Sequence, residues 1–213
     1  MAGTDAKKPR QRADARRNIE AILDAALACL ARDPDASVGD IARTAGVGRI
    51  TLYGHFPTRA DLVDAVFART LAEAQQTLDA VDLTGDPRAA LARLVASSWQ
   101  IVNRHRALLQ AAQRTIGPDR IRDQHKIPHR RVQGLIKRGR REGIFRDDLP
   151  TTWLVATFHN VLHGAAEELT AGRLNERAAD IVIVATLLAA FTAPSQPVPD
   201  PRPWLPNAMR HQP

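Results

Sequence analysis

The chain has few of the residues that build disulfide frameworks or aromatic binding sites. Its 213 residues include a single cysteine, Cys29, and only 4% are aromatic. One cysteine cannot form an internal disulfide, which suits a reducing compartment, so we expect a cytoplasmic protein. Cys29 lies in an apolar helical pattern, and we interpret it as a small buried hydrophobe.

Membrane-spanning stretches and catalytic motifs are also missing. The longest apolar run, Ile181–Phe191, is about half the length that a bilayer requires, so it predicts a buried helix and no membrane partner. No apolar signal region follows the first basic residues. The sequence has no nucleophile motif, no glycine-rich phosphate loop and no paired cysteines. We therefore expect neither an enzyme nor a cofactor.

The composition that remains favours an all-α protein. Alanine, leucine and arginine recur throughout, whereas the alternation of β-branched residues typical of strands is scarce. Lysine and arginine total 30 against 23 acidic residues, which gives a formal net charge of +7. A basic balance permits a polyanionic partner such as DNA without proving one.

The most informative segment is Ser37–Phe56, which reads as two short helices joined by a glycine turn. Ala42 is small enough for a close helix crossing, and Gly46 can adopt the positive φ of a sharp turn. Leu52 and Phe56 are four residues apart and so share the buried face of the second helix. Such a unit can hold its second helix in a major groove of DNA.

The opposite face of that second helix carries Arg49, Ile50, Tyr53 and Gly54, which are free to meet DNA. Ser37 stands at the expected N-cap of the first helix, with Asp40 three residues later as in a capping box. An ordinary αα-corner in a helical protein is the alternative interpretation of this segment.

Helical periodicity divides the rest of the chain into about nine helices in total. We expect a break or kink at Pro128, because proline removes a backbone donor. The predicted parts are a disordered basic arm at 1–14, a helix-turn-helix domain with a connecting fourth helix at 15–80, a second helical domain at 81–191, and a disordered proline-rich tail at 192–213.

Residues 15–67 resemble the tetracycline-repressor (TetR) family. The resemblance rests on the helix-turn-helix spacing and on the run Leu52-Tyr-Gly-His-Phe-Pro-Thr-Arg59. It implies an all-helical homodimer whose N-terminal helix-turn-helix domains bind a palindromic operator. Its C-terminal domains would pair and bind a small effector that releases the DNA, so the resemblance predicts a transcriptional repressor.

The same resemblance implies roles for single residues of this sequence. Arg49 and Ile50 would read bases, since arginine suits guanine and isoleucine suits the thymine methyl group. The phosphate contacts would come from Ser37, Thr51, Tyr53, His55 and Arg59. Gly48, Gly54 and Gly39 depart from the usual polar residues, so base contacts would be few and DNA shape would carry part of the specificity.

The second domain offers candidates for effector binding and for dimerisation. Apolar pockets with a few polar groups are typical ligand sites, which favours Trp99, His125, Trp153, Phe158 and His159 as lining residues; core packing is the alternative. The last two helices carry more apolar surface than one thin domain covers. We therefore expect a homodimer through a four-helix interface.

Two His-x-x-x-His pairs, His125/His129 and His159/His163, have the spacing of zinc ligands on one helical face. Neither pair includes the glutamate of a zinc hydrolase, and Pro128 interrupts the first pair. We therefore predict no metal site and interpret these histidines as lining a pocket or an interface. A basic run, Arg130–Arg141, is interpreted as a solvated charged face. The alternatives to a regulator are an architectural DNA-binding protein without effector and a helical metalloenzyme.

Overall fold

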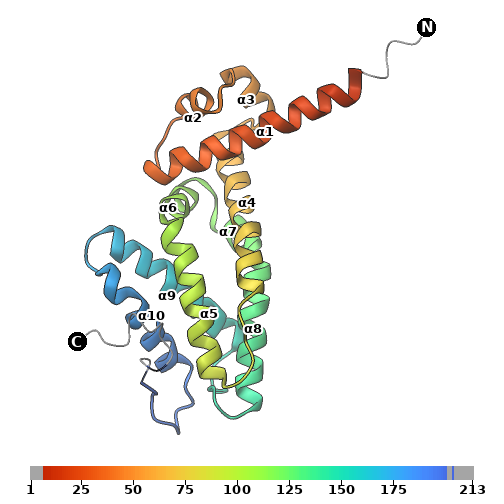
Figure 1. Cartoon of the computed structure of the whole chain (residues 1–213). Coiled ribbons are helices and arrows are strands. Elements are labelled where there is room, and N and C mark those ends of the chain that lie inside the picture. The colour runs from red at the N-terminus through yellow and green to blue at the C-terminus, as the bar shows by residue number, and fades with distance from the viewer. Residues whose placement is uncertain (1–6, 201–202, 204–213) are drawn as a thin grey trace. The chain divides into compact units, whose positions relative to one another are not determined.

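The computed structural model describes residues 7–200 and 203, and these form an all-helical fold (Figure 1). The expected fold class is confirmed. The ten helices are α1 (Lys7–Arg32), α2 (Val38–Ala45), α3 (Arg49–His55), α4 (Arg59–Asp79), α5 (Pro87–Arg104), α6 (Arg106–Thr115), α7 (Pro118–Gln124), α8 (Lys126–Arg141), α9 (Thr151–Thr170) and α10 (Glu176–Phe191).

The described residues divide into two compact units. One combines the chain up to Leu71 with Ala107–Gln124, and the other combines Ala72–Arg106 with the chain from His125 onward. The sequence predicted a boundary near residue 80, whereas this division falls inside α4 and assigns α6 and α7 to the N-terminal unit. Ion pairs explain part of that assignment, since Arg114 of α6 binds Asp35 at 3.0 Å and Arg120 of α7 binds Asp64 of α4.

Helix ends in the N-terminal unit follow local chemistry. The Ser37 hydroxyl accepts a hydrogen bond from the Asp40 amide at 3.1 Å, which confirms the predicted cap of α2. Gly46 ends α2 in the left-handed conformation with φ 68°, as the turn requires. Thr58 and Asp61 form a reciprocal capping box before α4, because each side chain accepts from the other's backbone amide at 3.1 Å.

The C-terminal unit is built from α5, α8, α9 and α10, which pack around one hydrophobic core. α9 and α10 form a hairpin (Figure 1). The side chains of Trp99, Phe158 and Phe191 are at most 3% exposed, and the Phe145 ring meets Phe191 edge-on at 5.9 Å. The predicted apolar faces of these helices therefore supply the core.

The basic run on α8 is largely structural rather than a solvated face. Arg138 donates to the backbone oxygens of Leu83 and Gly85, each at 2.7 Å. Arg140 binds the backbone oxygen of Arg146 at 2.8 Å and the hydroxyl of Thr151 at 2.6 Å. The interpretation as a solvated face was wrong for these two arginines, because the acceptors of Arg138 lie in a loop distant in sequence and those of Arg140 follow the end of α8, and periodicity reveals neither.

Two helix boundaries and the predicted tail also differ from the expectation. α1 begins at Lys7, so the described part of the predicted arm, 7–14, is helical. The expected break lies at His125, between α7 and α8, and Pro128 sits in the first turn of α8, where a missing amide leaves no helical bond unmade. Part of the predicted tail is also ordered, since the Gln196 side chain donates to the Gly143 backbone oxygen at 2.9 Å.

Gly139 is required by packing, which gives a stability prediction. A Cβ at Gly139 would overlap Cδ2 of the buried Phe145 ring. We expect Gly139→Ala to lower the free energy of unfolding by about 1–3 kcal/mol, because the core must shift. Guanidinium-induced unfolding would measure the change.

Gly134→Ala is the matched control for Gly139→Ala on the same helix. No atom lies within 4 Å of the Cβ that alanine would add at Gly134. We expect this variant to be more stable by up to about 1 kcal/mol, since alanine favours helix over glycine. Equal effects of the two substitutions would contradict the packing described around Phe145.

Candidate nucleic-acid interface and histidine cluster

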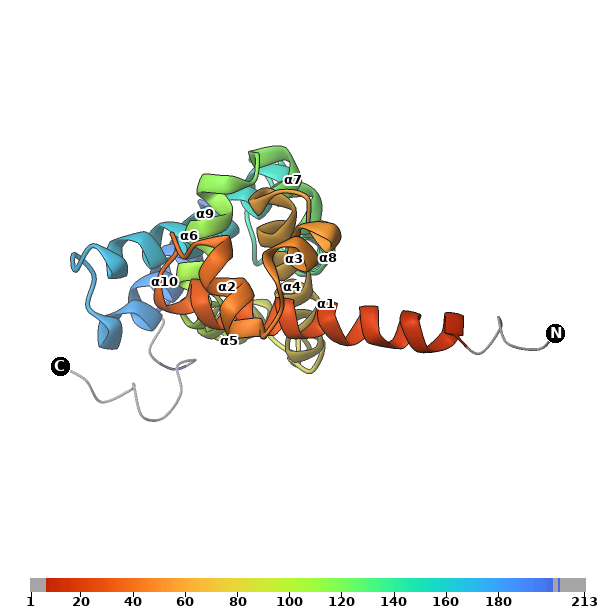
Figure 2. The same cartoon turned by 90° about the horizontal axis from the view of Figure 1, so that it is seen from above.

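The α2–turn–α3 unit is held from beneath by a small core. Ile41, Ala42 and Leu52 are each at most 1% exposed. Phe56, which follows the end of α3, is 9% exposed. Figure 2 looks onto α2 and α3, which lie nearest the viewer beside α1. The buried face predicted from the sequence is confirmed by these exposures.

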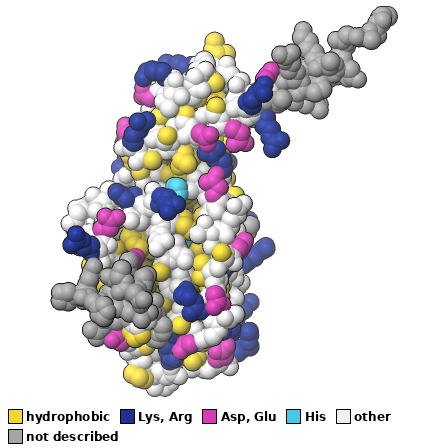
Figure 3. All heavy atoms as spheres, viewed as in Figure 1, with side chains coloured by type: hydrophobic (Ala, Val, Ile, Leu, Met, Phe, Trp, Pro, Cys, Tyr) yellow, Lys and Arg dark blue, Asp and Glu magenta, His cyan; other side chains and the backbone are white. Residues whose placement is uncertain are grey.

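The opposite face of α3 projects into solvent. Ile50 is 90% exposed and Tyr53 is 43% exposed, while Arg49 and Thr51 are also exposed. An isoleucine this exposed has no packing role within the chain, so its free apolar surface is available to a partner. Figure 3 shows Lys and Arg side chains together with hydrophobic side chains over the end formed by α2 and α3.

Arg49 lies across α2 in a way that the sequence did not reveal. Its Cζ lies 3.5 Å from the position that a Cβ would occupy at Gly39. Gly39 thus leaves a bare backbone surface over which the guanidinium passes. The absence of a side chain at Gly39, first interpreted only as a lost DNA contact, gives Arg49 room.

Ser37 and Arg59 are anchored by hydrogen bonds of their own. The Ser37 hydroxyl donates to the Asp40 carboxylate at 2.6 Å, which holds the pKa of that carboxyl below its usual value. Arg59 donates to the backbone oxygens of Ala36 and Pro34, the latter at 2.7 Å. An arginine has five donors, so the anchored guanidinium of Arg59 keeps others for a phosphate. His55, at the end of α3, is half-buried.

The cap at Ser37 predicts a specific loss of stability. We expect Ser37→Ala to lower the free energy of unfolding by about 1 kcal/mol, because the Asp40 amide loses its acceptor. Thermal unfolding of the two proteins side by side would measure it. Ser37→Asn should retain most of the stability, since asparagine is an equally good N-cap, and a loss as large as that of alanine would contradict the capping role.

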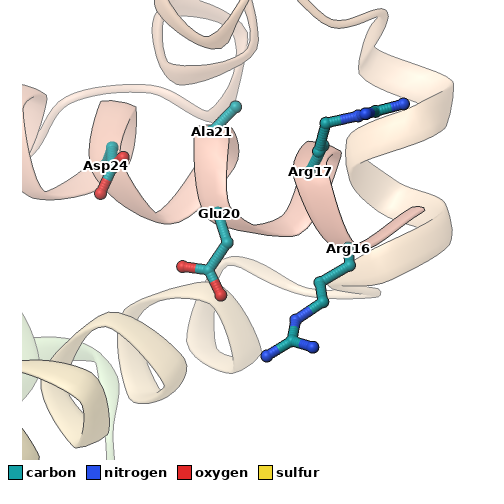
Figure 4. A pocket seen from close by; sticks show the side chains of 5 residues that line it. All are labelled: Arg16, Arg17, Glu20, Ala21 and Asp24. Carbon is teal, nitrogen blue, oxygen red and sulfur yellow. The ribbon is translucent and has the colours of Figure 1, made fainter. Parts of the chain in front are cut away.

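The predicted effector residues separate into buried and exposed positions. Trp99 and Phe158 are 3% and 1% exposed and belong to the core of the C-terminal unit. Trp153 is 60% exposed on α9, so it does not share that core. The N-terminal unit has a hollow of about 610 Å³ along α1. Figure 4 shows the side chains that line it, four of them charged: Arg16, Arg17, Glu20, Ala21 and Asp24.

His125 and His159, by contrast, lie close together in the C-terminal unit. The second histidine of each pair, His129 or His163, lies beside them. The ring centroids of His129 and His159 are 4.4 Å apart, and His125 lies 5.5 Å from both His159 and His163. The structure therefore joins two pairs that the sequence treated separately. Pro128 does not interrupt the first pair. The backbone amide of His129 donates to the backbone oxygen of His125 at 2.9 Å, so these two histidines are one helical turn apart.

Burial favours the neutral form of three members of this histidine cluster (His125, His129, His159 and His163), namely His129, His159 and His163. Desolvation lowers the pKa of His159 to about 2 and that of His163 to about 4, and it also lowers the pKa of His129. The neighbouring histidines add to these shifts. Nε2 of His159 is buried and has no hydrogen-bond partner among the described residues. Within those residues no group of three or more His, Cys, Asp or Glu side chains is ready to hold a metal ion as it stands.

Comparison with known proteins identifies the helix-turn-helix. Residues 22–66 match the family described as "Bacterial regulatory proteins, tetR family". The helix-turn-helix segment of this chain is thus of the TetR type. The matched residues run from the second half of α1 through α2 and α3 into α4, where the sequence placed its resemblance.

One relative, LfrR, extends the match in both a sequence and a structure comparison. An 86-residue segment is 41% identical to the HTH-type transcriptional repressor LfrR of Mycolicibacterium smegmatis, covering 40% of this chain and 46% of the relative. The chain thus matches less than half the length of that curated relative. The crystal structure of LfrR from Mycobacterium smegmatis with proflavine is 26% identical, with a TM-score of 0.61, over 81% of this chain and 94% of the other.

A third comparison shows the TetR fold alone. A putative tetR family transcription regulator from Shewanella sp. PV-4 has a TM-score of 0.65 at 22% identity, covering 83% of this chain and 98% of that one. Among the described residues, no helix is both long and apolar enough to cross a membrane.

Proposed function

We propose that this TetR-family chain is a dimeric, ligand-responsive DNA-binding regulator that acts in the cytoplasm as a transcriptional repressor rather than as an enzyme. The observation that carries the proposal is the solvent-facing side of α3, where Ile50 is 90% exposed next to Arg49. An exposed apolar side chain beside a free guanidinium suits the floor of a major groove, which presents thymine methyl groups and guanine acceptors.

The residues around α3 have complementary roles in this proposal. Arg49 and Ile50 contact base edges in the operator, and the phosphate backbone is bound by Ser37, Thr51, Tyr53, His55 and Arg59. The anchored positions of Ser37 and Arg59 support this division, because phosphate contacts fix the register of a protein on DNA. Base contacts then specify the sequence.

A second copy of the chain is the proposed partner of α9 and α10. Exposed or half-exposed residues at helical spacing form an uncharged stripe on each helix, Trp153, Thr157, Asn160 and Gly164 on α9 and Val182, Thr186 and Ala189 on α10. Trp153 and Val182 are 60% and 45% exposed, which is unusual for large apolar side chains without a partner. A two-fold axis would bury both stripes against their copies.

A small effector is proposed to bind in the C-terminal unit, near Trp99, Phe158, His125 and His159. The relative LfrR was crystallised with proflavine, which supports a small-molecule ligand. An effector releases DNA only if it binds the two conformations with different affinity. In this proposal the favoured conformation changes the spacing of the two α3 helices, so that they no longer enter both grooves together.

The proposal is tested by binding to duplex fragments that tile the DNA flanking this gene. Fluorescence anisotropy at about 0.15 M salt should find one fragment bound about 10³-fold more tightly than random duplex. That fragment should contain an inverted repeat. Uniform binding to all fragments, lost steeply with salt, would overturn the proposal and favour an architectural DNA-binding protein.

A further inference from the structure

Four histidines from two helices converge in the C-terminal unit. His125 and His129 stand at the start of α8, and His159 and His163 are one turn apart on α9. Five of the six pairs of rings have centroids between 4.4 and 6.4 Å apart. Because α8 and α9 pack directly against each other, the cluster is part of the folded unit and not an accident of side chains in solvent.

The spacing of these rings matches a known type of coordination. Four imidazoles bound to one tetrahedral zinc ion, with Zn–N bonds of about 2.0–2.1 Å, have ring centroids about 5 Å apart. The observed distances lie on both sides of that value. Two His-x-x-x-His pairs on neighbouring helices also bring four imidazole rings close together, and metal sites in helical bundles are likewise built from side chains on facing helices.

We propose that His125, His129, His159 and His163 form a binding site for a single divalent transition-metal ion of the zinc class, which ties α8 to α9. Imidazole is a preferred ligand of zinc, copper and nickel, whereas calcium and magnesium require oxygen ligands. The site lies in the C-terminal unit and is distinct from the DNA-binding face of α3.

A bound metal ion would give a partner to a buried ring nitrogen that has none in the part of the chain that the structure describes. The buried Nε2 of His159, which has no hydrogen-bond partner among the described residues, gains one in a bound metal. The ring nitrogens do not yet share one centre. Since the terminal torsion of histidine is broad, the rings can turn toward the ion without moving the helices.

The test measures metal binding directly, with neither DNA nor an effector present, so its outcome does not depend on whether the chain binds an operator. The full chain, prepared without a histidine tag and stripped with EDTA, is titrated with Zn²⁺ in competition with a chromophoric chelator. We expect one ion per chain with a dissociation constant below about 1 µM. Saturating Zn²⁺ should raise the midpoint of thermal unfolding by about 5–10 °C.

The double variant His159→Gln/His163→Gln removes the two ligands of α9. It should bind Zn²⁺ at least about 100-fold more weakly and lose the thermal shift, while His105→Gln, outside the cluster, should match the parent protein. Far-UV circular dichroism checks folding; if the double variant misfolds, His129→Gln replaces it, with an expected loss of at least about 10-fold.

Cobalt provides a spectroscopic check of the ligand set. Bound Co²⁺ should give the intense visible absorption of a tetrahedral site in the parent protein and lose it in the variants. Binding of less than about one tenth of an ion per chain, or Zn²⁺ affinity unchanged when the cluster histidines are replaced, would overturn the proposal.

Discussion

Replacing Arg49 with alanine is expected to weaken binding to the operator by between about 30-fold and about 10⁴-fold. A bidentate arginine–guanine contact contributes about 1–3 kcal/mol of discrimination, and a dimer on an inverted repeat loses two such contacts. Arg49 is the first residue of α3, exposed and unhindered by a side chain at Gly39. Titration of parent and variant on the same operator duplex would measure the loss.

Binding of the Arg49→Ala variant to random duplex should fall little, because non-specific binding depends on the summed charge. Arg141→Ala is the matched control, since Arg141 is exposed on α8 and its loss changes the net charge by the same amount. It should leave operator binding almost unchanged. Equal losses on operator and random duplex for Arg49→Ala would contradict its assignment to base reading.

The second large effect is expected from charges placed on the proposed dimer surface. The double variant Trp153→Glu/Val182→Glu puts carboxylates on the uncharged stripes of α9 and α10, where a two-fold interface would bury them next to their copies. We expect a monomer in sedimentation velocity. Operator affinity should fall by about 10²-fold or more, because the second half-site is no longer bound at high effective concentration.

Val198→Glu controls for the added charge itself. Val198 is 58% exposed but lies beyond α10, outside both stripes. This variant should remain dimeric and bind the operator normally. A double variant that still sediments as a dimer would contradict the assignment of α9 and α10 to the interface.

The helix-turn-helix could be predicted closely because its determinants are local. Gly46 at the turn, Ser37 at the cap, and Leu52 and Phe56 on one face depend on contacts within a few residues of each other. Helical periodicity and capping chemistry describe such contacts well. The exposed face of α3 could be predicted because it lies opposite the buried face.

The C-terminal unit contained features that the sequence could not reveal. The partners of Arg138 are backbone oxygens more than 50 residues away, and the two histidine pairs meet only because α8 packs on α9. Residue spacing alone carries no information on which helices become neighbours. Repeated His-x-x-x-His spacing on two helices was the available signal for the cluster, but Pro128 was given too much weight.

Methylation interference on the operator tests the central claim most directly, namely that two α3 helices read guanines in the major groove. Methylation at guanine N7 blocks the acceptor that Arg49 would use. We predict two symmetric groups of interfering guanines whose centres are one helical turn, or a multiple of it, apart, as two recognition helices require. Binding indifferent to N7 methylation, or interference confined to one unrepeated site, would contradict the account.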